Sequence, residues 1–591
     1  MNILGINAYH GDASACLIQN GQLVAAVEEE RFNRVKHWAG FPAESIRYCL
    51  KVGGINLQDL DHIALSFNPK ANLNRKLLFT LKQRPSLTSL LDRLNKQSKS
   101  VNLQSQLAAV GNCQPEQITA SIHTLEHHTT HLASGFFTSP FEKAAILSVD
   151  GMGDFVSTLS GVGNHNKLQY FSRTYFPHSL GYLYNAITLY LGFPAYGDEY
   201  KVMGLAPYGE PEYVEAMRRI IYPKADSFEL NLDYFTHHQQ GIAMKWDDGA
   251  PLVQPFHSPE LEKLLGSARK PNSSITSRHE NIAASLQAVT EEIIFHLLNH
   301  LHQICPSPNL CLTGGVAMNS VANGKITQYT PFENVYIPLG AADNGTCIGA
   351  AYFVWHQILK KPRQFVLTHA YWGSEFSHEE CLRVLEPYIA NQKLQPPQQL
   401  EIPDLLNRVV ASICEGKVIG WFQGRMEFGA RALGNRSLLA DPRRCDMRDI
   451  INLKIKIREK FRPFAPSILE EYVHEYFEMD KSAPFMEKVF KIRPEKRTQI
   501  PAVTHVDGTG RLQTVSRQTN PLYWDLINTF AQHTGIPILL NTSLNENEPI
   551  VRTPQEAIEC LLRTSMDGLV LGKHYIQCTH TDNQELAMLK V

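Results

Sequence analysis

The chain repeats one local pattern, and this repeat constrains the fold more than any other feature of the sequence. Short apolar runs at Ile3–Ile6 and Ala15–Ile18 flank a polar turn, and Asn20-Gly21 then leads into a further run. Asn-Gly between apolar runs is a strong hairpin signal, so we expect the chain to open with an antiparallel meander. Ala144–Ser160 repeats the design around an acidic, glycine-rich turn. Two such units, each followed by helical sequence, predict a duplicated α/β fold around a central cleft.

The length of 591 residues predicts at least two domains, because single hydrophobic cores stop growing well below this size. The apolar pattern breaks around Gln357–Thr368, and we place the boundary there, with residues 1–360 in one domain and 370–591 in the other. The first domain is expected to contain a long helix over Glu280–Gln303, where apolar residues recur with helical spacing. The second is expected to have strands at Val418–Phe422, Ile536–Leu540 and Gly568–Leu571.

Composition narrows the possible functions. The formal net charge is -2, so the overall charge does not indicate a nucleic-acid partner. Hydrophobic residues make up 43% of the chain and charged residues 19%, and no apolar run approaches the roughly 20 residues of a membrane span. The chain enters a strand at once, which leaves no room for a signal peptide. Eleven scattered cysteines without a CxxC pair are typical of reduced thiols, so we expect a cytoplasmic protein.

Two histidines four positions apart, His127 and His131, predict a metal site. On a helix this spacing puts both imidazoles on one face. Asp150 ends an apolar run that should form a buried strand, and Asp343 follows another, so both carboxylates are expected at strand tips. Two imidazoles and two carboxylates suit a cation such as Fe2+, Zn2+ or Mn2+. The alternative is a helix with incidental histidines, and His128 is expected to point elsewhere.

Glycine-rich turns follow two expected strands of the first domain. Gly314 and Gly315 come between an apolar run and a helix start that contains Asn319, and Asp343-Asn344-Gly345 precedes a small-residue helix at Cys347–Val354. Glycines let the backbone approach a ligand closely, and a helix N-terminus favours an anion. These turns indicate phosphate or nucleotide binding, unless they are simply tight connections.

The second domain holds a dense set of cationic and amide side chains among glycine and apolar residues. Arginines in such surroundings, rather than in charge runs, indicate binding, because a guanidinium offers a planar fork that matches phosphate oxygens. Structural ion pairs are the alternative. The set comprises Arg431, Lys456, Arg462, Arg511, Asn541 and Ser543.

These segments, together with several short motifs, resemble the NodU/CmcH/TobZ-type O-carbamoyltransferases nearly from end to end. The resemblance implies a duplicated actin/hexokinase-like (ASKHA, Kae1-like) α/β domain followed by a YrdC-like α/β domain, and a homodimer by analogy. The motifs are Leu4–Asn7, Asp12–Ala15, Glu28–Phe32, Lys36-His37, His127-His128 with His131, Asp150-Gly151, Gly197–Ala206, Gly314–Ala317 with Asn319, and Arg462–Pro466.

The resemblance implies an enzyme with two reactions. The second domain would make carbamoyl-adenylate from carbamoyl phosphate and ATP with Mg2+, and the first would pass the carbamoyl group to a hydroxyl group. Lys36 matches a lysine of the transfer site. The family's metal ligands, usually of iron, match His127, His131, Asp150 and Asp343. Its ATP and carbamoyl phosphate ligands match Arg431, Lys456, Arg462, Arg511 and Ser543.

His10 and Asp12 complete the expected transfer site. A neutral imidazole such as His10, oriented by Asp12, is suited to take the proton of the acceptor hydroxyl, and Lys36 is suited to steady developing negative charge. Many relatives have His directly before this Asp, whereas Gly11 separates the two here. This departure leaves open whether His10 is the base.

Two other functions fit parts of the sequence. An actin/hexokinase-class kinase would bind ATP at Gly314-Gly315, phosphorylate a small hydroxylated substrate and release ADP rather than AMP and pyrophosphate. A non-catalytic or tRNA-modification-type binding protein is disfavoured by the balanced charge and by the cationic set. The acceptor, a natural product or sugar in the family, has no readable motif. We expect its pocket to involve the basic helical insertion Asn68–Ser100, which could also act as a lid that attracts an anionic substrate, and Asp226–Lys270.

Overall fold

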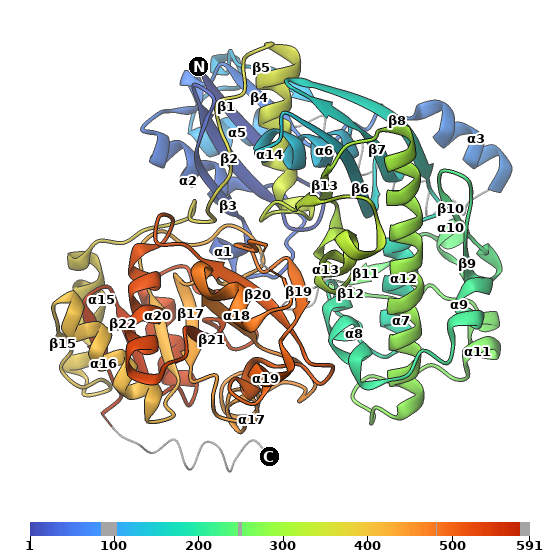
Figure 1. The fold of residues 1–591 in the computed structure, drawn as a ribbon. Helices are drawn as coiled ribbons and strands as arrows, with labels where there is room; N and C mark the ends of the chain where they lie inside the picture. The colour runs from blue at the N-terminus through green and yellow to red at the C-terminus, as the bar shows by residue number, and fades with distance from the viewer. Residues whose placement is uncertain (84–102, 246–250, 480, 580–591) are drawn as a thin grey trace. The chain divides into compact units, whose positions relative to one another are not determined.

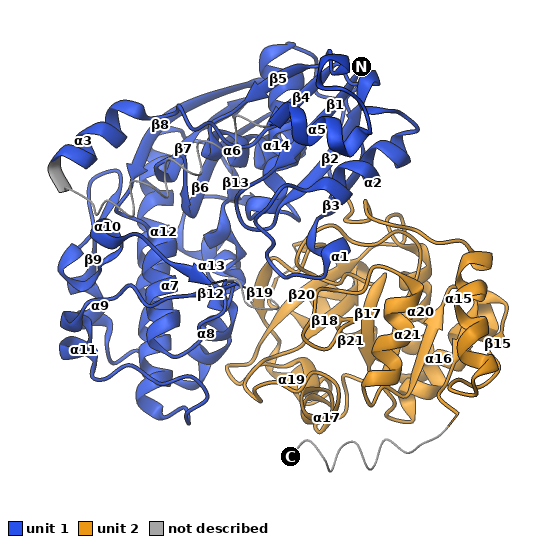
Figure 2. Cartoon of the chain, turned by 180° about the vertical axis from the view of Figure 1, so that it is seen from behind, with its two compact units in different colours: residues 1–367 blue, residues 368–591 orange. Residues whose placement is uncertain are grey.

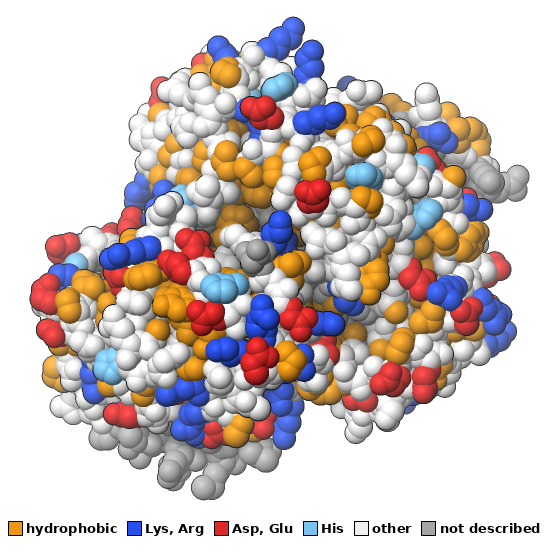
Figure 3. Space-filling view, viewed as in Figure 1, with side chains coloured by type: hydrophobic (Ala, Val, Ile, Leu, Met, Phe, Trp, Pro, Cys, Tyr) orange, Lys and Arg blue, Asp and Glu red, His pale blue; other side chains and the backbone are white. Residues whose placement is uncertain are grey.

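The computed structural model describes the chain except for residues 84–102, 246–250, 480 and 580–591. Mixed α/β structure with sheets and covering helices runs through the whole chain (Figure 1). The chain divides into two compact units, Met1–Leu367 and Thr368–Val591 (Figure 2). On the face drawn in Figure 3, acidic and basic side chains are interspersed, in keeping with the net charge of -2. All eleven cysteines are free thiols.

The two larger sheets of unit 1 share one strand arrangement. In each, three antiparallel strands are followed at one edge by two parallel strands. The first sheet runs β3-β2-β1-β4-β5 and the second β8-β7-β6-β13-β14. This confirms the predicted opening meander and its repeat. The strands are β1 (Asn2–Asn7), β2 (Ser14–Gln19), β3 (Gln22–Glu28), β4 (His62–Leu65), β5 (Ser121–Thr124), β6 (Lys143–Gly153), β7 (Val156–Asn164), β8 (Lys167–Tyr175), β13 (Asn309–Thr313) and β14 (Asn334–Tyr336).

Helices α6 (His127–Thr138) and α14 (Thr346–Phe353) pack against each other in the core of unit 1. Helix α6 follows the first sheet but packs on β6 and β13 of the second, whereas α14 follows the second sheet and packs on β1 of the first. The helices meet closely at Gly349, where a Cβ atom would lie 1.9 Å from the carbonyl oxygen of Thr130. Only glycine fits this crossing without displacing the backbone of α6.

The predicted long helix is confirmed as α12 (Ser277–Ile304), which starts slightly earlier than expected. After β13 the chain forms a short 3-10 turn, so α13 (Ser320–Tyr329) begins later than the glycine pair suggested. The basic insertion forms α3 (Leu73–Gln83), and its residues 84–100 lie outside the described residues. The other helices are α1 (Glu30–Asn33), α2 (Ala43–Gly53), α5 (Leu103–Gly111), α7 (Leu180–Tyr190), α8 (Glu199–Leu205), α9 (Val214–Ile220), α10 (His237–Gln240) and α11 (Pro259–Leu265), with short strands β9 (Ile221–Pro223), β10 (Phe228–Leu230), β11 (Met244–Lys245) and β12 (Leu252–Val253).

Unit 2 is built on one mixed sheet with strand order β15-β23-β22-β16-β17-β21-β18-β20-β19. Amphipathic helices bury their apolar faces in a single core with the sheet. The three predicted strands are present as β16, β21 and β22. The strands are β15 (Gln398–Gln399), β16 (Ile419–Phe422), β17 (Arg436–Ala440), β18 (Ala465–Leu469), β19 (Lys488–Lys491), β20 (Thr509–Val515), β21 (Ile538–Ser543), β22 (Gly568–Leu571) and β23 (His574–Ile576), and the helices are α15 (His378–Ala390), α16 (Ile402–Cys414), α17 (Met447–Lys454), α18 (Val473–Tyr476), α19 (Pro494–Arg497), α20 (Pro521–Thr534) and α21 (Pro554–Arg563).

Candidate active site

Helix α6 brings the imidazoles of His127 and His131 together. The helix is capped by Glu126, whose carboxylate accepts a hydrogen bond from the backbone N–H of His128 (3.3 Å). His127 and His131 are one helical turn apart, both are fully buried, and their Nε2 atoms lie 3.0 Å from each other. Two ring nitrogens are therefore aimed at the same point.

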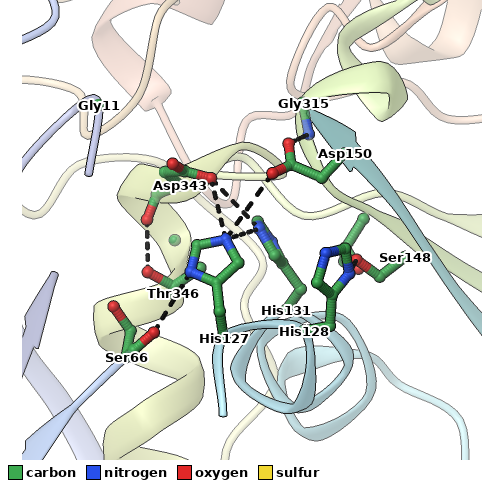
Figure 4. Close-up of polar contacts among 12 residues, drawn as sticks. Gly11, Ser66, His127, His128, His131, Ser148, Asp150, Gly315, Asp343 and Thr346 are labelled. Atoms are coloured by element: carbon green, nitrogen blue, oxygen red, sulfur yellow. Dashed lines mark hydrogen bonds and ion pairs between the residues drawn. The ribbon is translucent and has the colours of Figure 1, made fainter. Parts of the chain in front are cut away.

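Asp150 on β6 and Asp343 in the turn before α14 complete this group (Figure 4). Asp343 Oδ1 lies 3.4 Å from His127 Nε2 and 3.3 Å from His131 Nε2, and Asp150 Oδ2 lies 3.7 Å from His127 Nε2. One ligand atom from each of the four residues lies within 4.8 Å of all the others. The structure thus brings together the four residues that the sequence predicted as metal ligands.

The geometry of this four-residue group fits a divalent cation. Ligand atoms that share a cation at bond lengths of about 2.0–2.2 Å lie roughly 3–4 Å apart. The four distances given above, from 3.0 Å to 3.7 Å, fall in this range. His127 Nδ1 lies 3.3 Å from the carbonyl oxygen of Ser66, which leaves Nε2 as the ligand atom. Burial lowers the pKa of His127, but the carboxylates of Asp343 and Asp150 overcome it and raise that pKa well above the usual value. In turn His127 holds the pKa of Asp343 well below its usual value, although burial acts against this shift.

His128 has a different role, as its position on the helix predicted. Its Nδ1 lies 2.9 Å from the hydroxyl of Ser148, and its Nε2 lies 2.9 Å from the carbonyl oxygen of Val156. Both ring nitrogens are therefore engaged by the second sheet. Burial, followed by the two neighbouring imidazoles, lowers the pKa of His128 well below its usual value, so the ring is neutral and ties α6 to the sheet.

Asp12 pairs with His37, whereas we expected it to orient His10. Asp12 Oδ1 lies 2.7 Å from His37 Nδ1, and the backbone N–H of His37 donates to Glu30 Oε2 (2.8 Å). Burial opposes protonation of His37, but Asp12 and Glu30 raise its pKa to about 9. His10 still lies beside the metal-type group, with its ring centroid 4.6 Å from that of His127. The sequence analysis quoted His37 within the motif Lys36-His37 but assigned it no role.

Lys36 and Tyr196 lie next to this pair. Lys36 is partly exposed, and its charge acts to lower the pKa of His37. The ring of Tyr196 packs edge-on against His37, with centroids 5.4 Å apart. Burial, followed by the carboxylates of Asp343 and Asp12, raises the pKa of Tyr196 well above its usual value. Nothing in the sequence singled out Tyr196, which directly precedes a quoted motif.

The glycine pair of unit 1 supports the four-residue group. Gly314 has a φ of +92°, and a Cβ there would lie 2.1 Å from the carbonyl oxygen of Val149. The backbone N–H of Gly315 donates to Asp150 Oδ1 (2.7 Å). Asn319 caps α13 through the backbone N–H of Ala322 (3.0 Å). These contacts give the three residues structural roles, and their part in nucleotide binding stays a prediction.

Three arginines of unit 2 gather around Arg511. Burial, followed by the charges of Arg431, Arg458 and Arg462, lowers the pKa of Arg511 well below its usual value. Its buried Nε has no hydrogen-bond partner within the described part of the chain. Clustered guanidinium groups are suited to an anion such as a phosphate. Arg458 was not in the predicted set, although it stands within the same cationic segment.

Lys456 and Ser543, both predicted as phosphate ligands, bind each other. The ammonium of Lys456 is buried and lies close to four oxygens of the turn that ends β21. A direct contact with phosphate would require it to release one of them. The oxygens are Ser543 O (2.6 Å), Ser543 Oγ (3.3 Å), Asn545 O (2.7 Å) and Asn545 Oδ1 (2.6 Å).

Asn541 lies earlier on the same strand and is buried in a separate network. Its Nδ2 donates to the carbonyl oxygen of Ala432 (3.2 Å), to Ser467 Oγ (3.1 Å) and to Gln513 Oε1 (2.8 Å). These bonds join β21 to β18, β20 and the arginine-bearing loop. Its binding of ATP or carbamoyl phosphate stays a prediction.

The fold and the sites define a two-unit α/β protein with a metal-type group in one unit and an arginine group in the other. Residues 2–352 match the family described as Carbamoyltransferase N-terminus, and residues 410–578 match Carbamoyltransferase C-terminus. The chain therefore belongs to the carbamoyltransferase family. It is an enzyme of carbamoyl transfer.

Individual relatives agree with this assignment. The protein sll1178 of Synechocystis is 41% identical over 99% of this chain and 98% of its own length. Nodulation protein NolNO of Sinorhizobium fredii is 38% identical over 97% of this chain and 79% of its own. The 3'-hydroxymethylcephem-O-carbamoyltransferase of Streptomyces clavuligerus is 32% identical over 47% of this chain and 50% of its own. Solved structures match less well: HypF of T. kodakarensis, 13% identical, covers 60% of this chain and 47% of its own with a TM-score of 0.32, too low to assign a fold.

No helix in the described ranges is both long enough and apolar enough to cross a bilayer.

Proposed function

We propose that this chain is an ATP-dependent O-carbamoyltransferase that uses carbamoyl phosphate. Unit 2, YrdC-like, makes carbamoyl-adenylate and releases pyrophosphate. Unit 1, Kae1-like and of the actin/hexokinase class, transfers the carbamoyl group to a hydroxyl and releases AMP. The observation that carries the proposal is that the two units hold different kinds of side chains. Unit 1 has a cluster of imidazoles and carboxylates, and unit 2 has a cluster of arginines.

Adenylation explains why the arginines are needed. A carbamoyl group is a poor electrophile, because its nitrogen donates into the carbonyl, and an adenylate supplies a good leaving group. ATP with Mg2+ and carbamoyl phosphate are both anionic, and Arg431, Arg462 and Arg511 supply donors and charge for them. Lys456 holds Ser543 in place at the end of β21.

Transfer requires an activated carbonyl and a positioned hydroxyl. His127, His131, Asp150 and Asp343 would hold a divalent metal, most simply Fe2+, which polarises a carbonyl oxygen as a Lewis acid when bound. Asp12, fixed by His37, and the nearby His10 and Lys36 line the part of unit 1 where the acceptor hydroxyl would lose its proton. The acceptor bond forms between the hydroxyl oxygen and the carbamoyl carbon as the bond to the adenylate phosphate breaks.

The acceptor is proposed to be a sugar or other hydroxylated natural product. The cephem relative is named for carbamoylation of a hydroxymethyl group, which makes an alcohol the acceptor there. We further propose a cytoplasmic enzyme that forms a homodimer and binds neither nucleic acid nor membrane.

Two variants test the division of labour. We expect His127→Ala to release pyrophosphate from ATP and carbamoyl phosphate at the wild-type rate but to lose most carbamoyl transfer. We expect Arg511→Ala to lose pyrophosphate release, while Arg517→Ala, at an arginine whose side chain is 66% exposed, retains it. Loss of pyrophosphate release in His127→Ala would contradict two separate sites. Release of ADP by the wild type would favour a kinase instead.

A further inference from the structure

Tyr196 lies against His37 and Gly11, beside the Asp12–His37 pair of unit 1. Its hydroxyl is close enough to Asp343 and Asp150, in the metal-type group, and to Asp12, in this pair, to interact with all three charges. The backbone N–H of Tyr196 donates to the carbonyl oxygen of Pro251 (2.8 Å), which anchors the residue. The ring packs edge-on against His37. Tyr196 is thus held beside both groups by contacts that do not use its hydroxyl.

Two glycines make room for this arrangement. A Cβ on Gly11 would lie 2.6 Å from the hydroxyl oxygen of Tyr196, and a Cβ on Gly197 would lie 2.4 Å from His37 Nε2. Gly197 also has a φ of +85°, which other residues rarely adopt. The glycine between His10 and Asp12 therefore has a physical reason: it leaves the space that the Tyr196 hydroxyl occupies.

The donors in this space have no acceptor among the residues that the structure describes. Within the described residues, neither the hydroxyl of Tyr196 nor His37 Nε2 makes a hydrogen bond, whereas His37 Nδ1 is satisfied by Asp12. Both side chains are partly exposed, so a substrate can reach them. A phenylalanine would pack equally well between Gly11 and His37. The hydroxyl is consequently the part of Tyr196 that packing does not explain.

We propose that Tyr196 is a substrate-contacting residue of the transfer site, whose hydroxyl donates a hydrogen bond to the carbonyl oxygen of the carbamoyl group. This inference rests on the proposed function. Negative charge develops on that oxygen when the acceptor attacks the carbamoyl carbon, and a fixed donor stabilises it. The acceptor oxygen bonds to the carbon, the carbon–oxygen bond to the adenylate phosphate breaks, AMP leaves, and the acceptor's proton passes to solvent. Tyr196 keeps its own proton throughout, and His37 is a positioning residue for its ring.

The test is Tyr196→Phe, which removes only the hydroxyl. Water serves as the acceptor, because its attack on the carbamoyl carbon passes through the same charged intermediate. We expect pyrophosphate release within about twofold of the wild type, an unchanged melting temperature, and kcat for AMP release about 100-fold lower. AMP release is corrected for the background measured with His127→Ala. Tyr222→Phe, which removes the Glu229-bonded hydroxyl of a residue that is 37% exposed, should leave both rates unchanged.

Gly11→Ala gives an independent check, because its methyl group displaces the Tyr196 hydroxyl. It should lower AMP release to a similar extent, and the Gly11→Ala/Tyr196→Phe double variant should lose no more than either single variant. AMP release at the wild-type rate in Tyr196→Phe overturns the inference. Equal losses of pyrophosphate and AMP release, with a lower melting temperature, also overturn it, because they indicate a structural role. If the wild type forms no pyrophosphate, or releases AMP no faster than His127→Ala, the proposed function fails first and the inference falls with it.

Discussion

At the scale of single residues, His37 links the stability of unit 1 to pH. Its pKa of about 9 lies above the usual 6.5, so protonation stabilises the fold fully below about pH 6.5, and this contribution is lost as the pH rises through about 9. The side chain is 28% exposed, so solvent reduces the effect. We expect His37→Asn to cost on the order of 2 kcal/mol at pH 6 and much less at pH 10, measured by guanidinium unfolding.

A histidine without these partners provides the control for that experiment. His165→Asn changes an exposed residue of the β7–β8 turn, and its effect on the free energy of unfolding should be the same at both pH values. A loss in His37→Asn that does not vary between pH 6 and pH 10 would show that the pairing with Asp12 is not the source of stability.

Lys456 provides a second prediction at this scale. Replacing it by methionine leaves buried oxygens of Ser543 and Asn545 without their donor, so Lys456→Met should destabilise unit 2 by about 3 kcal/mol and abolish pyrophosphate release. Thermal unfolding and a pyrophosphate assay measure the two effects. Lys454→Met, at an exposed position two residues away, should change neither. A variant with wild-type stability and only a higher KM for carbamoyl phosphate would instead make Lys456 a direct ligand.

The sequence identified some of these residues and not others, for a physical reason. Helical spacing brings His127 and His131 together, so this pair could be predicted. The two aspartates do meet the pair, but the expectation that they stand at strand tips was wrong: Asp150 lies within β6, and Asp343 lies in the 3-10 turn between β14 and α14. The pairing of Asp12 with His37 depends on the path of a loop. Arg34 and His37 both have positive φ values in this loop (63° and 53°), which non-glycine residues rarely adopt. No sequence pattern predicts such values at these positions. The hydrogen bonds that occupy the ammonium of Lys456 likewise could not be predicted, because they depend on where the end of β21 lies in the fold.

At the scale of elements, the α6–α14 crossing depends on Gly349. Alanine favours helices over glycine by about 1 kcal/mol, but its Cβ would overlap the carbonyl oxygen of Thr130. We therefore expect Gly349→Ala to destabilise unit 1 by about 3 kcal/mol, seen as a lower melting temperature. Gly54→Ala meets no atom within 4 Å, so it should cost only about 1 kcal/mol of left-handed strain. Equal effects of the two substitutions would refute the close crossing.

Helices and strands whose apolar residues recur at a regular spacing were the easiest to predict. The opening meander, its repeat and α12 followed from apolar spacing, because each buries a regular face. The start of α13 did not follow, because Asn319 rather than the glycine pair provides the N-cap, and a 3-10 turn fills the interval. The glycine pair and Asn319 are both suitable helix starts, so tertiary contacts rather than local sequence determine which of them begins α13.

At the scale of the whole molecule, metal should stabilise unit 1. A cation that binds only the folded state adds about 2.7 kcal/mol at a concentration 100 times its dissociation constant. Chelator treatment is therefore expected to lower the melting temperature of unit 1 and abolish transfer, with both restored by Fe2+. His131→Ala should show no such response to chelator or Fe2+. A wild-type melting temperature that chelator and Fe2+ leave unchanged would argue against a metal at this group.

The two-unit organisation was visible in the sequence only as a break in periodicity. The structure divides the chain at Leu367 and Thr368. The expectation that one unit is Kae1-like and the other YrdC-like came from the resemblance alone, not from any pattern of spacing, and it stays a prediction. Loops and insertions determine acceptor specificity in such a fold, and their conformation cannot be predicted from the chemistry of their residues.

The exchange of helices between the sheets of unit 1 has a consequence for synthesis on the ribosome. The first sheet is translated early, but α14, which covers β1, is the last α-helix of the unit to be made. The hydroxyl of Ser14 likewise cannot donate to the carbonyl oxygen of Asn344 (2.8 Å) until that residue has been made. Until residue 353 has emerged, a nascent chain keeps the apolar face of β1 uncovered. Ribosome-bound chains of this protein should therefore stay chaperone-bound and protease-sensitive for most of the time needed to translate unit 1.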